Sequence, residues 1–191
     1  MIKLDNILNI TNKKDFREWL SKNASKEKEC WIQVKRGKPI DNNIFYYLDA
    51  VEVALCFGWI DSTHKEIDGI RYQRFSPRSK NSPWTELNKE RCRRLIKLGL
   101  MTELGYKVLP SLGPRSFKID EDIEKSLKEA RCYSKFKSFH PLYQRIRAYN
   151  VYFYKSRNKE MYEQTLNHLI EETKKGNMFG EWNDYGRLLN Y

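Results

Sequence analysis

The polar residues best placed for chemistry lie on the apolar face of a helix that we expect over residues 83–98. At about 100° per residue, two polar residues share one arc of this helix with its apolar residues. That arc contains Trp84, Leu87, Asn88, Arg91, Leu95 and Leu98. A guanidinium that faces a core is costly unless a carboxylate or a bound anion neutralises it. We therefore expect Arg91 to be paired, and we predict Asp61 on a neighbouring hairpin as its partner.

Two interpretations of this pair stay open. In the functional one, six residues form a pocket for a carboxylate or phosphate, with an aromatic wall and bidentate donors. These six are Trp59, Asp61, Arg78, Trp84, Asn88 and Arg91. In the structural one, the ion pair braces the hairpin against the helix, which is the commoner use of a buried arginine. An enzyme with a pocket around Asp61 and Arg91 is a further hypothesis, and no residue is assigned a catalytic role.

Basic charge is concentrated in the middle of the chain. The formal net charge is +11, and residues 65–118 hold thirteen Lys or Arg against five Asp or Glu. A candidate basic surface consists of Arg71, Arg74, Lys89, Arg93, Arg94 and Lys97. Such charge favours an anionic small molecule, an acidic protein or nucleic acid, and does not choose among them. Because aromatic residues alternate with these arginines, a nucleic-acid-binding module is the main alternative function.

The four cysteines indicate core packing rather than chemistry. Cys30, Cys56, Cys92 and Cys132 are 26, 36 and 40 residues apart, without a Cys-x-x-Cys pair. This spacing argues against zinc and iron–sulfur sites, so we expect free thiols that pack as small hydrophobes. Cys56 with His64 could form a nucleophile and base, but nothing beside Cys56 in the sequence would lower its pKa. We expect no metal and no cofactor.

The element pattern predicts an α+β fold, with a small antiparallel sheet from the N-terminal half packed against helices, and a mainly helical C-terminal half. Strands are expected over residues 29–35, 60–66 and 70–75, and Asp68-Gly69 is a hairpin turn signal. Helices are expected over residues 13–22, 46–57, 83–98, 102–109, 120–131, 141–155 and 158–175. Ser82 is the expected N-cap of the third helix, with Pro83 at its first position.

The chain length predicts one domain over residues 1–191. A helical subdomain from about residue 119 is the alternative division, and residues 112–120 are the only place where the chain could be cut. The C-terminal segment is rich in aromatic residues, so we expect it to pack against the rest of the protein. No apolar run is long enough to span a bilayer, and the first residues lack an export signal. We expect a cytoplasmic protein without membrane insertion, and the oligomeric state stays open.

Several ordered motifs resemble those of the YdeI/OmpD-associated proteins. They are Ala54-Leu-Cys-Phe-Gly-Trp-Ile-Asp-Ser62, Tyr72-x-Arg74-Phe-Ser-Pro-Arg78, Ser82-Pro-Trp84 with Asn88 and Arg91, and Gly99-x-Met101 to Gly105. Together with Phe16 to Leu20 and Trp31, they extend the resemblance over about residues 10–112. The C-terminal part differs, because the family's helix with threonine and arginine is not found there.

The resemblance implies a bacterial protein of stress response, in bacteriocin or antimicrobial-peptide protection, and association with an outer-membrane porin, without an established reaction. Some similar proteins carry a thymidylate synthase label. We reject that activity here, because no cysteine stands in a Pro-Cys-His setting and the chain is short. The function we predict is stress or antimicrobial-peptide tolerance through binding of an anionic ligand or partner.

Overall fold

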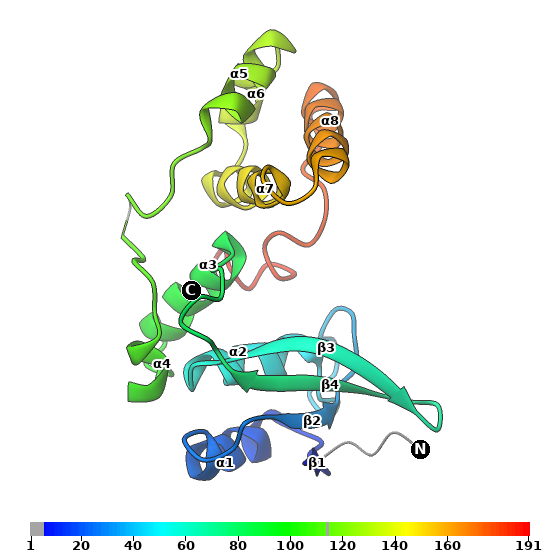
Figure 1. The fold of residues 1–191 in the computed structure, drawn as a ribbon, viewed down its shortest axis with the longest axis vertical. Coiled ribbons are helices and arrows are strands. Elements are labelled where there is room, and N and C mark those ends of the chain that lie inside the picture. Colours follow the sequence, from blue (N-terminus) through cyan, green and yellow to red (C-terminus); the bar gives the residue numbers. More distant parts are fainter. Residues whose placement is uncertain (1–5, 114) are drawn as a thin grey trace. The chain divides into compact units, whose positions relative to one another are not determined.

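The computed structural model describes residues 6–113 and 115–191, which form two compact units. The first unit contains the described residues up to Pro83 together with Arg91–Pro110, and the second contains Trp84–Glu90 and Ser111–Tyr191. Helix α3 (Glu86–Lys97) therefore contributes residues to both units. The predicted α+β fold is confirmed: the sheet lies in the N-terminal half and the C-terminal half is mainly helical (Figure 1).

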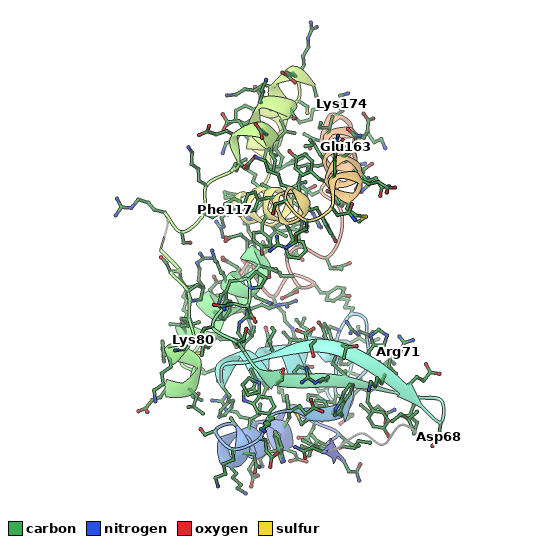
Figure 2. The ribbon with its side chains drawn as sticks, in the orientation of Figure 1. Asp68, Arg71, Lys80, Phe117, Glu163 and Lys174 are labelled. Atoms are coloured by element: carbon green, nitrogen blue, oxygen red, sulfur yellow. The ribbon has the colours of Figure 1, made fainter. Side chains whose placement is uncertain are left out.

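The sheet of the first unit has four strands in the order β1-β2-β4-β3. They are β1 (Ile7–Leu8), β2 (Cys30–Gln33), β3 (Trp59–Ile67) and β4 (Ile70–Pro77). Strand β1 pairs with β2 in parallel, and the other pairs are antiparallel. The predicted hairpin is confirmed, because Asp68 and Gly69 both have positive φ and connect β3 to β4. Figure 2 shows Asp68 at this turn. Strand β1 was not predicted, since two residues give no readable alternation.

Three helices belong to the first unit alone: α1 (Lys13–Asn23), α2 (Tyr47–Cys56) and α4 (Glu103–Lys107). All three lie where the sequence predicted helices. Asn12 caps α1 by accepting a hydrogen bond from the Asp15 amide at 2.9 Å. On the covered side of the sheet, Phe16 of α1 packs against Phe75 of β4, with ring centroids 5.4 Å apart. Helix α2 lies against β3, so its apolar residues are buried as predicted.

The predicted start of α3 is wrong. The helix begins at Glu86 rather than at Pro83, and Thr85 is its cap, because the Thr85 hydroxyl accepts a hydrogen bond from the Asn88 amide at 3.1 Å. Ser82 belongs to a preceding turn, where its amide donates to the Ser79 carbonyl at 3.1 Å. Both Ser82 and Thr85 are good caps by residue type, so only the turn decides between them. As a consequence, Trp84 lies outside the helix.

The second unit is a group of helices around one apolar core. Its helices are α5 (Glu121–Glu129), α6 (Tyr133–Ser138), α7 (Pro141–Tyr154) and α8 (Lys159–Lys175). The short α6 was not predicted. Trp182 and Leu188 are buried in the same core as Leu127, Tyr143 and Leu169, which confirms that the C-terminal segment packs against its unit. No helix within residues 6–113 and 115–191 is long and apolar enough to cross a membrane.

Buried charge also ties the second unit together. Glu86 is fully buried, with Lys89 Nζ 2.7 Å from its Oε1. Arg145 of α7 donates to Glu90 Oε2 at 2.8 Å, and the hydroxyl of Tyr191 donates to the other oxygen of Glu90 at 2.8 Å. A buried carboxylate is tolerated only when it is paired, so these contacts hold the first turn of α3 to α7 and to the C-terminus.

Close backbone packing joins α2 to α4 in the first unit. The Cys56 carbonyl at the end of α2 accepts hydrogen bonds from both the amide and the hydroxyl of Thr102, at 3.1 and 2.6 Å. A Cβ atom on Gly105 would lie 2.4 Å from that same carbonyl oxygen and 2.4 Å from the sulfur of Met101. Only glycine fits this position of α4.

We predict that Gly105→Ala lowers the free energy of unfolding by about 2 kcal/mol, because a backbone carbonyl cannot move aside for the added methyl group. Urea denaturation followed by circular dichroism measures the change. Gly113→Ala is the control, since a Cβ there meets no atom within 4 Å. Equal stability of the two variants would show that the α2–α4 contact is not tight.

Candidate functional site

The six residues predicted to form a pocket are divided between the two units. Trp59, Asp61, Arg78 and Arg91 belong to the first unit, whereas Trp84 and Asn88 belong to the second. Trp59 is a core residue with a 1% exposed side chain, and its indole N–H donates to the Ala24 carbonyl at 3.1 Å. Arg78 and Arg91 are both buried, as expected for Arg91. Trp59 therefore contributes to packing and is not available as the wall of a pocket.

Asp61 makes its hydrogen bond with a tyrosine. The Tyr47 hydroxyl, at the start of α2, donates to Asp61 Oδ2 at 2.5 Å. Burial and, to a smaller extent, the negative charge of Asp61 raise the pKa of Tyr47 to about 12, while the positive charges of Arg36 and Arg91 oppose the shift. Asp61 and Arg91 are thus both close enough to Tyr47 to influence its ionisation. Tyr47 and Asp61 form the centre of a polar cluster, and the pairing of Asp61 with Arg91 stays a prediction.

Arg36 is held against this cluster from the loop that follows β2. Its guanidinium carbon lies 3.6 Å from the centroid of the Tyr47 ring. Its Nη2 donates to Gln73 Oε1 at 2.7 Å. The Arg36 side chain is otherwise exposed and forms no salt bridge with a residue in the described part of the chain. Stacking and one hydrogen bond therefore fix the orientation of a cation whose remaining N–H groups face solvent.

Gln73 connects Arg36 to an irregularity of the sheet. The register of β3 against β4 shifts between Asp61 and His64, which is a β-bulge. Gln73 of β4 is 2% exposed, and its Nε2 donates to the carbonyls of Thr63 at 3.0 Å and Ser62 at 3.4 Å. A bulge leaves carbonyls without strand partners, and here the amide of Gln73 supplies the missing donors.

Sequence reasoning missed three of the four residues that make this site, namely Arg36, Tyr47 and Gln73. Arg36 was interpreted only as part of a turn, and Tyr47 as the start of a buried helix. A signal existed for Gln73, because it stands two residues before the core residue Phe75 on an alternating strand. A polar residue on the core side of a strand must find a buried hydrogen-bond partner.

The predicted basic surface does not consist of unpaired cations. Four of its six residues have a carboxylate within 4 Å. These pairs are Arg71–Glu66 at 3.9 Å, Arg74–Glu29 at 2.6 Å, Lys89–Glu86 at 2.7 Å and Arg94–Glu52 at 2.7 Å. Lys89 belongs to the second unit, and Arg93 and Lys97 lie on the part of α3 in the first unit. Figure 2 shows Arg71 close to the hairpin turn of β3 and β4.

The cysteines pack as small apolar residues, which confirms the sequence prediction. All four are buried and free of disulfides. Burial raises the pKa of the Cys56 thiol above its ordinary value, and it raises the pKa of Cys92 to about 12. A thiol that stays protonated is a poor nucleophile, which argues against Cys56 with His64 as a catalytic pair. Among the described residues, no group of three His, Cys, Asp or Glu side chains could hold a metal ion.

The Tyr47–Asp61 contact predicts a specific pH dependence. Because the folded state raises the pKa of Tyr47 from about 10 to about 12, its contribution to stability is complete below about pH 10 and is lost as the pH rises through 12. Tyr47→Phe should reduce the loss of unfolding free energy between pH 9.5 and 12 by about 2 kcal/mol. Asp61→Asn should reduce it less, since burial is the larger cause. Identical pH profiles of Tyr47→Phe and the unmodified protein would contradict this geometry.

Comparison with known proteins gives one family model that covers the residues of this cluster. The model of the family described as "Domain of unknown function (DUF8412)" matches residues 8–108, which include Arg36, Tyr47, Asp61 and Gln73. A search of curated proteins and a search of solved structures found no match. The resemblance to the YdeI/OmpD-associated proteins stays a prediction. Because the family model covers more than half of the chain, the chain belongs to the DUF8412 family.

Proposed function

We propose that this protein is a binding module for an anionic ligand, and that Arg36 receives a carboxylate or phosphate group of that ligand. The observation that carries the proposal is the state of Arg36: the guanidinium is exposed, its orientation is fixed by Tyr47 and Gln73, and it has no salt bridge with a described residue. A preoriented guanidinium loses little conformational freedom when an anion binds to it.

The local charge supports an anion rather than a cation as the ligand. Lys35 and Lys38 flank Arg36 in the loop and are exposed, and neither forms a salt bridge with a described residue. One oxygen of the Asp61 carboxylate, Oδ2, accepts the short hydrogen bond from Tyr47. The carboxylate therefore anchors the aromatic ring on which Arg36 lies, and positive charge dominates the exposed side of the cluster.

The biological setting is a further part of the proposal. We propose that the protein acts in the cytoplasm, in stress or antimicrobial-peptide tolerance. Four buried cysteines without disulfides are compatible with a reducing compartment. The stress-related role rests on the resemblance of residues 10–112 to the YdeI/OmpD-associated proteins.

Isotope-labelled protein titrated with sodium phosphate and with sodium acetate, at constant ionic strength, tests the proposal by nuclear magnetic resonance. Arg36→Met should weaken binding of the preferred anion about ten-fold or more, because hydrogen bonds to charged groups contribute about 1.5–3 kcal/mol. Arg36→Lys should restore binding only in part, since an ammonium group lacks the planar fork of donors. Whether phosphate or acetate binds more tightly identifies the class of anionic group.

Lys38→Met is the matched control, because it removes one exposed positive charge from the same loop. Equal weakening by Arg36→Met and Lys38→Met would show that only diffuse surface charge attracts the anion, and the proposal would fail. A single-stranded oligonucleotide tests the nucleic-acid alternative. Tight, strongly salt-dependent binding that Arg36→Met leaves unchanged would favour that alternative.

A further inference from the structure

A pocket of about 650 Å³ lies in the first unit, apart from the side chain of Arg36. Its walls come from β1 and the segment after it, from the end of β2, from residues 43–45 and from Tyr72 of β4. Small-molecule sites in proteins usually have volumes of about 300–1,000 Å³. The pocket therefore has the size of a small-molecule site, at the end of the sheet where β2 ends.

Several apolar side chains that line this pocket are partly exposed to solvent. Ile7, Leu8, Ile10, Val34 and Ile44 all border it, and none of them is fully buried. The neighbouring Phe45 is 6% exposed and belongs to the core. Partly exposed aliphatic side chains that lie beside core residues can form the wall of a binding site for an apolar ligand.

One positive charge stands among these walls. Lys35 is the only charged residue among the described residues that form the pocket, and the other polar ones are neutral amides and hydroxyls such as Asn43, Gln33 and Thr11. Lys35 forms no salt bridge with a residue of the described ranges. A single unpaired lysine in the wall of a pocket with mixed apolar and neutral polar residues favours a ligand with one negative charge and an apolar body.

We infer that this pocket binds a small apolar monocarboxylate, with the apolar body between Val34, Ile44 and Phe45 and the carboxylate at Lys35 Nζ. This site goes beyond the proposed function, because Arg36 points to Tyr47 and Gln73 and does not line the pocket. The chain thus contains two anion-recognition sites that single substitutions can separate.

Octanoate and 1-octanol are the probes, since they differ in charge and share an apolar chain. Dissociation constants come from titrations of the isotope-labelled protein followed by nuclear magnetic resonance. Lys35→Met should weaken octanoate binding about five-fold and leave octanol binding unchanged. Ile44→Ala should weaken both probes by a similar factor, because it removes apolar contact area.

Matched controls come from the same loop. Lys38→Met and Ile40→Ala change exposed residues that do not line the pocket, and Ile40 is 79% exposed. Both variants should bind octanoate like the unmodified protein, and Arg36→Met should leave unchanged the octanoate affinity read from the amide signals of pocket residues such as Val34 and Ile44. A loss of octanoate binding in Arg36→Met but not in Lys35→Met would overturn this inference and leave the proposed function intact.

Two other results would overturn the inference. One is that neither probe saturates the protein at millimolar concentration. The other is a molecular mass of twice 23.0 kDa in solution, together with shielding of residues 7–11 from solvent in the dimer, because a second copy of the chain would then occupy the pocket.

Discussion

The buried amide of Gln73 is the interaction on which the charged site depends. Strand β3 bulges between Asp61 and His64, so carbonyls there lose their partners on β4. Gln73 donates to two of these carbonyls with its Nε2 and keeps its Oε1 for the guanidinium of Arg36. An amide is the side-chain group that can donate and accept in this way at one buried position. A leucine of similar size would remove the hydrogen bonds of Gln73 to the bulge carbonyls and to Arg36.

A chain of contacts connects Gln73 to Asp61 through Arg36 and Tyr47. Arg36, fixed at one end by the amide, covers the ring of Tyr47, and the hydroxyl of Tyr47 meets Asp61 on the strand beside the bulge. Loop, helix and hairpin are joined by these contacts without a direct ion pair between Arg36 and Asp61. In this arrangement the carboxylate positions the tyrosine ring, and the exposed group is a planar guanidinium whose donors suit a carboxylate or phosphate.

Helices and strands that have local sequence signals could be predicted from the sequence. The contacts between these elements could not. Asp68-Gly69 predicts the hairpin, and the positive φ of Gly58 agrees with the predicted end of α2. The start of α3 was misplaced because Ser82 and Thr85 are equally good caps. The site could be predicted only in part: of its four residues only Asp61 was a candidate, as the expected partner of Arg91 on the neighbouring hairpin. The contact between Arg36 and Gln73 could not be predicted, because a β-bulge is a property of the register between two strands and has no residue pattern of its own. The alternating strand indicates only that Gln73 needs a buried hydrogen-bond partner.

A double-mutant cycle between Gln73→Leu and Arg36→Met, read as affinity for the preferred anion, tests the account most directly. If the amide of Gln73 orients Arg36 for the anion, Gln73→Leu alone should weaken binding about ten-fold, and Arg36→Met should then add little more. Asn42→Leu, which changes an exposed amide of the loop after β2 that does not line the pocket, should leave anion affinity unchanged. Fully additive losses in the double variant, or undiminished binding in folded Gln73→Leu, would contradict the account.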